Sequence, residues 1–452
     1  MQWYDYAGWL MAIAMGLLTL SFLAASYRER EHRAFRRGLW LLVPLAVWIS
    51  LLAWLPLNRA TVLFAGEILF VLFLALLLLP LGKKGTLRIT GPLERVDERD
   101  IIFARMRYEE GTPRYLDYYS RHPERRKLDD GLRAMPRLGG PGTPLYHPFN
   151  SRLADAAFGF LADIRATVEG PVSPEVIQVD PTEMSRRLKG MARYYGARLA
   201  GVAKLNPAYV YTHIGRGLGQ YGTEIELDHP YALVFAVEMD HFMVKQAPGT
   251  TTLTESASQY VEAAKIAIVI AYYIRSLGYQ ARAHMDANYR LIVPPIAADA
   301  GLGEIGRIGI LMSPQYGPRM RLGVVTTDMP LTVDRPLTYG IQDFCERCLK
   351  CAYNCPAGAI PRGKKTGVRG VEKWAVDADK CYTFWRKVGT DCAICMSVCP
   401  YSKPAGFIHN ATRFAISRSV VARQLAIWAD DIFYGKHPRS KELPPWMKPL
   451  AD

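Results

Sequence analysis

All eight cysteines of this 452-residue chain lie between Cys345 and Cys399, and this clustering limits what that stretch can fold into. A disulfide framework is typical of short secreted chains, in which the cysteines are spread over the whole length. Closely clustered thiols in a long chain indicate bound metal instead. The stretch is therefore predicted to fold around metal rather than around disulfide bonds.

The cysteines form two groups with the spacing of a two-cluster ferredoxin. The first group reads C-x2-C-x2-C-x3-C-P, and the second reads C-x10-C-x2-C-x3-C-P. In such ferredoxins the fourth cysteine of a run binds the other cluster. Two [4Fe-4S] clusters need eight thiolates, which equals the number of cysteines. The predicted ligands are Cys345, Cys348, Cys351 and Cys399 for one cluster, and Cys355, Cys381, Cys392 and Cys395 for the other. Zinc is the alternative, but zinc sites do not normally use a triple run ending in Cys-Pro.

Three long apolar runs occupy the N-terminal region, at 8–25, 39–57 and 61–81. Each is near the roughly 20 residues that a helix needs to cross a bilayer. A signal peptide would have one short apolar region and a cleavage site. The sequence therefore predicts a three-helix transmembrane anchor over residues 1–85. Glu67 lies inside the third run, where it is either a functional carboxylate, beside a quinone or in a proton path, or a residue that reaches the interface.

Basic residues flank the three runs unevenly. The first loop contains five arginines, the second loop contains Arg59, and Lys83, Lys84 and Arg88 follow the third run. Lysine and arginine concentrate in cytoplasmic loops. The N-terminus is therefore predicted outside the cell, and everything after the third run in the cytoplasm. These arginines explain part of the net charge of +14, and without interleaved basic and aromatic residues a nucleic-acid partner is not predicted.

The rest of the chain divides into segments of different composition. Residues 86–170 are polar and rich in Arg, Pro and Gly, which indicates a linking or wrapping segment. In residues 171–340, strands are predicted at 231–237 and 322–327, and a capping box at Thr252 and Glu255 opens a helix that ends at Gly278. Strands alternating with helices indicate an α/β layered domain. An iron–sulfur domain at 341–404 and a C-terminal helical tail at 405–452 follow.

Two segments, at 217–222 and 301–306, match the G-x-G-x-x-G pattern that many dinucleotide-binding sites contain. The dinucleotide-binding fingerprint needs a strand directly before the first glycine. Neither sequence has a strand-like segment there, so a nicotinamide cofactor is not predicted.

The segment from Leu277 to Pro404 resembles the cobalamin-dependent reductive dehalogenases, with the matching pieces in the family's order. These pieces are LGYQA at 277–281, AGLGEIGRIG at 300–309, SPQYGPR at 313–319, DMPL at 328–331, Phe344-Cys345 and the two cysteine groups. VEMD at 237–240 also resembles the family, so the resemblance covers about residues 170–404.

The resemblance implies a nitroreductase-like α/β corrinoid-binding domain fused to a bacterial ferredoxin-like domain with two [4Fe-4S] clusters. It implies base-off cobalamin without a histidine on cobalt, and the D-x-H-x-x-G motif of histidine-ligated cobalamin is absent from the sequence. The clusters would deliver electrons one at a time, the corrinoid would break a carbon–halogen bond, and a proton would replace the halide. The implied substrate is an organohalide.

The resemblance also implies site residues. Tyr260 is the expected proton donor, and Arg307 is the expected basic residue that stabilises its tyrosinate and lowers its pKa from near 10. The alternative for Tyr260 is an ordinary core aromatic. Asn288, within 284–288, is the candidate for orienting the substrate. Small residues permit close approach of a corrinoid or its nucleotide tail, and the candidates are Gly301, Gly303, Ser313 and Gly317.

The chain departs from the usual family plan, in which an exported enzyme docks on a separate membrane protein with three spans. Here the spans are fused to the enzyme, and Arg36-Arg37 is interpreted as a topology signal rather than an export signal. We therefore expect a protein integral to the inner membrane, in contact with membrane lipid, with its catalytic domain in the cytoplasm. Its electron donor is expected to be a membrane quinol, a ferredoxin or a flavodoxin, and a homodimer is compatible with the sequence.

Two other functions stay open. An epoxyqueuosine reductase-like enzyme would share the corrinoid and cluster modules, act on tRNA and place an aspartate in the acid role. A membrane-anchored iron–sulfur electron carrier without a substrate would not need the α/β domain.

Overall fold

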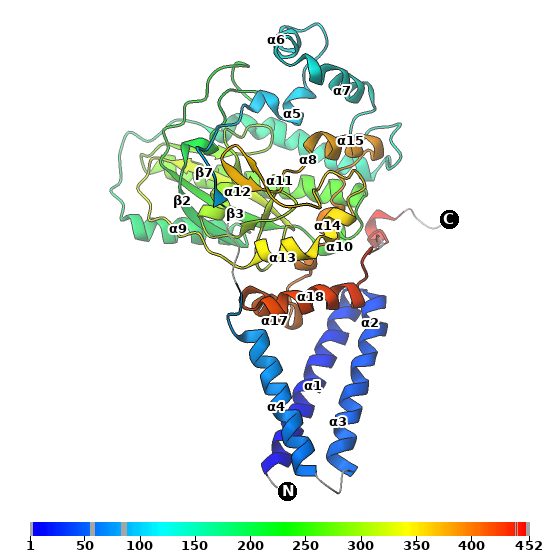
Figure 1. Ribbon diagram of the computed structural model, residues 1–452. Coiled ribbons are helices and arrows are strands. Elements are labelled where there is room, and N and C mark those ends of the chain that lie inside the picture. Colours follow the sequence, from blue (N-terminus) through cyan, green and yellow to red (C-terminus); the bar gives the residue numbers. More distant parts are fainter. Residues whose placement is uncertain (1–2, 55–58, 83–87, 439, 441, 449–452) are drawn as a thin grey trace. The chain divides into compact units, whose positions relative to one another are not determined.

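The protein is represented by a computed structural model, which describes residues 3–54, 59–82, 88–438, 440 and 442–448 (Figure 1). Lys83 and Lys84, which carry part of the orientation prediction, lie outside the described residues. The chain divides into two compact units. The anchor unit comprises residues 1–85, 339–348 and 403–439, and the core unit comprises residues 86–338, 349–402 and 440–452. This division differs from the predicted boundaries, since 339–348 and most of the C-terminal tail pack with the N-terminal helices.

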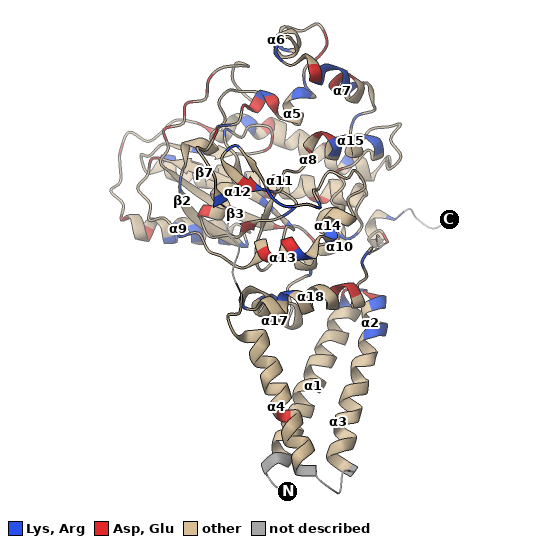
Figure 2. Ribbon diagram, viewed as in Figure 1, with Lys and Arg blue, Asp and Glu red and all other residues tan. Residues whose placement is uncertain are grey.

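The anchor unit contains three long apolar helices. They are α1 (Trp3–Arg28), α2 (His32–Gly38) continued through a 3-10 turn (Leu39–Leu41) into α3 (Leu42–Trp54), and α4 (Arg59–Leu78). The stretches 6–28, 32–53 and 61–78 are long and apolar enough to cross a membrane, in agreement with the three predicted spans. Figure 2 shows few charged residues along α1, α3 and α4. Helices that are apolar on all sides suit a lipid environment.

Three shorter helices complete the anchor unit: α13 (Ile341–Cys348), α17 (Phe407–Arg418) and α18 (Val420–Phe433). Ser419 separates α17 from α18 and caps α18, since its Oγ accepts the backbone N–H of Val421. The same hydroxyl donates to the carbonyl of Leu76 at 2.6 Å. The buried Arg423 of α18 donates to Asp343 of α13 at 2.9 Å. These contacts hold the C-terminal helices on the N-terminal ones.

The core unit is built on an antiparallel sheet with the strand order β2-β3-β7-β4. The strands are β2 (Leu199–Lys204), β3 (Tyr231–Glu238), β7 (Met320–Thr327) and β4 (Ala281–His284). The strands predicted at 231–237 and 322–327 are confirmed as β3 and β7. Side chains of β3 alternate between two hydrophobic clusters, with Leu233 and Phe235 on one face and Val234 and Ala236 on the other.

Helices cover both faces of this sheet (Figure 1). One face packs against α11 (Thr250–Ser276), α9 (Pro181–Tyr194) and α8 (Asn150–Asp163), and the other packs against α12 (Val293–Asp299). The remaining helices and strands of the core unit are short. They are β1 (Arg88–Ile89), α5 (Ile102–Arg105), α6 (Pro113–Arg121), α7 (Pro123–Ala134), α10 (His241–Val244), β5 (Glu304–Ile305), β6 (Leu311–Met312), α14 (Lys350–Tyr353), β8 (Thr366–Val368), β9 (Val371–Lys373), α15 (Ala378–Val388) and α16 (Ile394–Ser397).

The start of α11 differs from the prediction. The helix begins at Thr250, and the N-cap is Gly249 rather than Thr252. Thr252 is the third residue of the helix, and its hydroxyl donates to the carbonyl of Gly249 at 2.7 Å. Glu255 does not close a capping box, because its Oε1 accepts the backbone N–H of Asp240. The helix ends before Gly278 as predicted, where φ is +89°.

The segment 86–170 is folded over much of its length rather than serving only to link. Four tyrosines, at 108, 115, 118 and 119, form a buried aromatic cluster of their own. Leu161 and Val168 belong to the same hydrophobic cluster as the sheet. The tyrosine hydroxyls make the sequence look polar, whereas the rings supply the apolar area that a small core needs.

Gly323 of β7 offers a test of this packing. A Cβ at this position would lie 2.3 Å from the ring of Phe235, so Gly323→Ala forces the ring or the strand to move. We expect a loss of about 1–3 kcal/mol of stability. Gly190 in α9 is the matched control, since a Cβ there meets nothing within 4 Å. Gly190→Ala should stabilise by roughly 0.5–1 kcal/mol. Pulse proteolysis in urea measures both, and equal midpoints for the two variants would contradict the packing described.

Candidate active site

An open cavity of about 750 Å³ lies in the core unit. This volume is within the range of small-molecule sites. Its walls come from the segment 96–105, from α7 and α11, from the segment 286–294 and from the residues that lead into α15. The ionisable or phenolic residues that line it are Asp100, Arg105, Arg125, Tyr211, Arg216, Tyr260, Asp286, Tyr289, Arg369, Asp377 and Asp379.

Tyr260 reaches this cavity from α11, and an arginine lies on its ring. The guanidinium carbon of Arg321 is 4.0 Å from the ring centroid, a cation–π geometry. Arg321 comes from β7, where it pairs with Val237 of β3 on the face that packs against α11. Arg321 also donates to Ser256 Oγ, and its Nε has no hydrogen-bond partner within the described part of the chain. Strand register therefore brings a cation to the predicted proton donor.

The surroundings of Tyr260 set its pKa in opposing directions. The charge of Arg321 is the largest single influence and lowers the pKa of Tyr260. Burial and the negative charges of Asp286 and Asp391 raise it, and together they outweigh the arginines, so the pKa lies above its usual value near 10. The phenol is therefore protonated at neutral pH. Burial also raises the pKa of Tyr289, which leaves a second neutral phenol in the cavity.

Arg216 is held in place by a buried carboxylate. Its Nε lies 3.1 Å from Oε1 of Glu98, which is fully buried. The other oxygen of Glu98 accepts the backbone N–H of Gly215 at 2.9 Å and that of Arg216 at 3.1 Å. Glu98 thus fixes both the backbone and the side chain at Arg216, and presents a rigid cation at the cavity wall.

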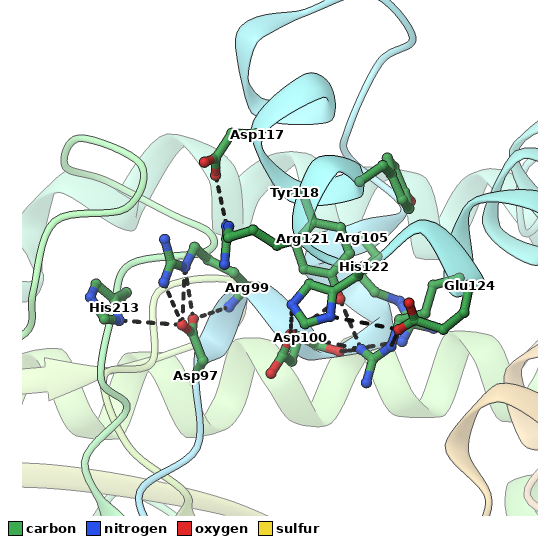
Figure 3. Close-up of polar contacts among 12 residues, drawn as sticks. Asp97, Arg99, Asp100, Arg105, Asp117, Tyr118, Arg121, His122, Glu124 and His213 are labelled. Atoms are coloured by element: carbon green, nitrogen blue, oxygen red, sulfur yellow. Dashed lines mark hydrogen bonds and ion pairs between the residues drawn. The ribbon is translucent and has the colours of Figure 1, made fainter.

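A polar network ties the segment 97–105 to the hairpin of α6 and α7 (Figure 3). Asp100 accepts from the hydroxyl of Tyr118 at 3.1 Å, and it lies 3.5 Å from His122 and 3.8 Å from Arg125. Asp100 and Arg125 both line the cavity. This network therefore positions one wall of the site.

Arg307 does not occupy the predicted place. Its guanidinium donates to the carbonyls of Pro361 at 2.8 Å and Gly363 at 3.0 Å, and it stacks on Trp374 with 4.4 Å to the ring centroid. The arginine that lies on the ring of Tyr260 is Arg321. The physical reason is the fold, since β7 runs alongside α11, whereas Arg307 follows the short strand β5 and binds backbone of the iron–sulfur region.

Asn288 also lies outside the set of cavity-lining residues. It is fully buried, its Oδ1 accepts from Arg282 at 3.1 Å, and its Nδ2 donates to the carbonyl of Arg165. Within 284–288, the residue that lines the cavity is Asp286. Asn288 therefore supports the loop, and Asp286 is the better candidate for contact with a substrate.

The predicted corrinoid contacts pack closely against the chain itself. A Cβ on Gly303 would lie 2.2 Å from the carbonyl of Met312, and one on Gly317 would lie 2.6 Å from Tyr401. A Cβ on Gly301 would meet the carbonyl of Arg335 at 2.6 Å. Ser313 accepts the backbone N–H of Tyr316 at 2.9 Å. The small side chains at these positions are thus explained by close packing within the core unit.

The predicted ligands of one cluster, Cys355, Cys381, Cys392 and Cys395, all belong to the core unit and influence one another electrostatically. Burial, together with the charges of Cys381 and Cys355, raises the pKa of Cys392 to about 12. Burial raises the pKa of Cys381 to about 11, again with a contribution from Cys355. Burial also raises the pKa of Cys395, with contributions from Cys351, Cys392, Cys381 and Cys355 in that order. These thiols would bind iron by losing their protons, and their assignment to one [4Fe-4S] cluster stays a prediction.

The other predicted cluster draws its ligands from both compact units. Cys345 and Cys348 lie on α13 of the anchor unit, whereas Cys351 and Cys399 belong to the core unit. Their joint role as ligands stays a prediction.

The cavity extends to the helix that carries a predicted cluster ligand. Val376, Asp377 and Asp379 line it, and Cys381 follows on α15. Arg105, which also lines the cavity, forms ion pairs with Asp379 and with the buried Asp129. Tyr260 and the start of α15 thus border one space, which suits proton and electron delivery to one bound molecule.

Arg321, Arg216 and Tyr289 are the residues that the sequence analysis missed, whereas Asp286 lies within the predicted range 284–288. A sequence signal existed for Arg321, since it is a charged residue inside an otherwise apolar strand. Charge at an alternating strand position is costly unless the side chain has a function or a partner. The other residues lie in irregular segments, where spacing gives no comparable signal.

Comparisons with known proteins agree with this architecture. Residues 344–403 match the 4Fe-4S dicluster domain family. A tetrachloroethene reductive dehalogenase from Desulfitobacterium hafniense is 32% identical over 280 residues, which is 52% of this chain and 50% of the relative. An epoxyqueuosine reductase from Synechococcus is 28% identical over 181 residues, which is 34% of this chain and 51% of that protein.

Solved reductive dehalogenase structures share the fold. The catabolic reductive dehalogenase NpRdhA in complex with 3-bromo-4-hydroxybenzoic acid has a TM-score of 0.64 at 27% identity, over 79% of this chain and 49% of that chain. A reductive dehalogenase structure described for B12-dependent dehalogenation has a TM-score of 0.60 at 26% identity, with the same coverage. This chain is therefore similar to reductive dehalogenases in sequence and fold, and it spans about half the length of the curated relatives it matches.

The cluster ligands can be tested by iron content. Cys392→Ala should lower bound iron from about eight to about four atoms per chain, because one [4Fe-4S] cluster loses a ligand. Met396→Leu is the matched control, since it changes a neighbouring side chain without removing a thiol. Iron analysis and electron paramagnetic resonance of the reduced, anaerobic protein measure the result. Full iron content in Cys392→Ala would exclude this cysteine as a ligand.

Proposed function

We propose that this chain is a membrane-anchored reductive dehalogenase that removes halide from an organohalide, using cobalamin and two [4Fe-4S] clusters. The observation that carries the proposal is a cavity bordered both by Tyr260, on whose ring Arg321 lies, and by the segment that leads into Cys381. The resemblance to dehalogenases in sequence and fold supports it. The halogenated molecules named for these relatives, tetrachloroethene and 3-bromo-4-hydroxybenzoic acid, are the substrate classes to test first.

The overall reaction sets what the residues must supply. An organohalide takes up two electrons and one proton, its carbon–halogen bond breaks, a carbon–hydrogen bond forms, and halide leaves. Bound cobalamin supplies the chemistry that cleaves the carbon–halogen bond. The two clusters carry the electrons singly, from a donor that we propose to be a membrane quinol, a ferredoxin or a flavodoxin.

The protein's own part is to hold and deliver the proton. Tyr260 carries it on its phenol oxygen, and the raised pKa keeps the phenol protonated at neutral pH. When the proton leaves, the guanidinium of Arg321 stabilises the tyrosinate. Arg216 and Asp286 offer a fixed cation and a carboxylate for orienting the substrate. Arg307 and Asn288 act in this proposal by supporting the backbone around the site.

We also propose that the core unit is a nitroreductase-like corrinoid-binding domain. Two fully buried threonine hydroxyls, Thr251 Oγ1 and Thr390 Oγ1, have no hydrogen-bond partner among the described residues. Such groups suit the amide side chains of a corrinoid. We still propose corrinoid contacts at Gly301, Gly303, Ser313 and Gly317, made by their backbone atoms. At the three glycines, other parts of the chain occupy the space where a side chain would lie.

Tyr260→Phe should lower the rate of halide release by about 10²–10⁴-fold, the usual contribution of a general acid, while cobalt and iron stay bound.

Arg321→Gln should give a smaller loss and raise the pKa of Tyr260 further, because the largest pKa-lowering charge is removed. Since the donor works protonated, loss of the proton from Tyr260 should not reduce activity between pH 7 and about 10. Anaerobic halide release against pH, with metal analysis, measures these effects. Arg187→Gln, on an exposed helix surface, is the control.

Other outcomes of the same assay distinguish the alternatives. Halide release that survives Tyr260→Phe and is lost in Asp286→Asn would make the aspartate the acid of the dehalogenase. An absence of halide release, with reduction of epoxyqueuosine in tRNA, would favour the epoxyqueuosine reductase-like function. A purified protein that contains all of its iron but no cobalt would exclude both corrinoid enzymes and would favour the iron–sulfur electron carrier.

We propose that the protein is integral to the inner membrane, with its N-terminus outside and the core unit in the cytoplasm. The five arginines between the first two spans support this orientation. To test this orientation, a reporter protein that works only in the cytoplasm is fused to the C-terminus, and we expect it to be active. A reporter active only outside would reverse the topology.

A further inference from the structure

The helices α17 and α18 reverse the burial pattern of an ordinary surface helix. Their exposed side chains include four large apolar ones: Phe407 is 69% exposed, Phe414 51%, Trp428 57% and Ile432 54%. Their buried side chains include polar and charged residues, which are His409, Arg413, Arg423 and Asp430. A helix packed on a protein in water presents the opposite pattern. The apolar face must therefore meet something other than water.

The apolar positions form one stripe on each helix. Phe407 and Phe414 are seven residues apart on α17, and Trp428 and Ile432 are four residues apart on α18. Spacings of four and seven place side chains on the same helix face. Each pair of apolar side chains therefore lies on one helix face, and on α17 the polar Asn410 and Arg418 are exposed on the same face.

The charged groups on the other face are paired inside the anchor unit. His409 lies 2.7 Å from Glu29, and Asp430 lies 3.5 Å from Lys403. Arg423 pairs with Asp343 at 2.9 Å. Because these contacts fix the rotation of both helices, the apolar stripes cannot turn inward without breaking a buried hydrogen bond on α17 and buried ion pairs on α18.

Both helices are attached at one end of the spans. Ser419 Oγ donates to the carbonyl of Leu76 in the last full turn of α4, and Val420 N–H donates to the carbonyl of Leu81. Arg37 of α2 donates to the carbonyl of Ile432, and Phe22 of α1 packs on Phe433 with 4.8 Å between ring centroids. The ends of membrane spans lie at the boundary between acyl chains and headgroups. The attachment therefore holds α17 and α18 at that depth.

The neighbouring side chains at this end of the spans are those of a membrane interface. Tyr27 near the end of α1 and Trp40 between α2 and α3 are each 74% exposed. Tyrosine and tryptophan are enriched at the level of lipid headgroups. Figure 2 shows basic residues on α2 at the same end of the anchor unit. Arg418, the last residue of α17, stacks on Phe414 and adds a cation beside the stripe.

We propose that α17 and α18 form a collar that lies in the plane of the membrane interface, with Phe407, Phe414, Trp428 and Ile432 inserted among phospholipid acyl chains. The occupant of the apolar face is lipid, because the face is continuous with the spans and fixed at their ends. In-plane amphipathic helices bind lipid in this way. The collar rests on the membrane anchor and not on the dehalogenase reaction, so its test is independent of activity.

Tryptophan quenching in the full chain tests the collar. The protein is reconstituted in phosphatidylcholine and phosphatidylglycerol vesicles, with or without bromine on the acyl chains. The difference between the parent chain and Trp428→Phe isolates the emission of Trp428. We expect brominated lipid to remove most of this emission and aqueous acrylamide to remove little. Trp446→Phe gives the reference for a tryptophan of similar exposure in the core unit.

The other outcomes each overturn the proposal. Quenching of Trp428 by acrylamide and not by brominated lipid would place it in water. Protection from both quenchers would indicate a protein partner, including a second copy of this chain. As a second measurement, benzoylphenylalanine at Phe414 should crosslink to lipid on illumination, and an adduct with protein alone would contradict the collar.

Discussion

Packing of α11 across the face of β3 and β7 is the constraint on which the proposed site depends. This contact places Tyr260 beside Arg321, and Phe235 fits under β7 only because position 323 lacks a side chain. The buried apolar residues of α11, such as Ile266, Ile270 and Ile274, hold the helix in one rotation. A rotation of α11 would move Tyr260 out of the cavity, so the same hydrophobic packing that stabilises the core sets the geometry of the proton donor.

Charge is used differently in the two units. In the core unit, buried carboxylates such as Glu98 fix arginines at a cavity wall, where a fixed cation is useful for binding. In the anchor unit, buried ion pairs such as Arg423–Asp343 fix short helices in place and leave apolar side chains facing outward. In both units, burying a charged group costs desolvation free energy. The gain is a fixed position for the paired side chain or helix, and not only stability.

Much of the fold was predictable because strong local patterns mark it. The spans, the strands β3 and β7, and the end of α11 at Gly278 follow from apolar length, β-branched runs and a left-handed glycine. The predicted N-cap of α11 was wrong by three residues, since the N-cap is Gly249 rather than Thr252 and Glu255 bonds to Asp240 instead of closing a capping box. The helices of 86–170 were missed because their apolar surface is provided by tyrosines rather than by aliphatic residues.

The sequence by itself determined the eight cysteines as a two-cluster set and the three apolar spans, because both depend on spacing along the chain. Only the tertiary structure decided which arginine meets Tyr260. Arg307 and Arg321 are both arginines downstream of Tyr260, but pairing of β7 with β3 brings Arg321 to α11, while Arg307 binds the carbonyls of Pro361 and Gly363. The tertiary structure also decided which face of α17 and α18 is buried. From the sequence, their apolar side chains could face either the protein core or the surroundings. Contacts with residues far away in the sequence, His409 with Glu29 and Arg423 with Asp343, fix the orientation.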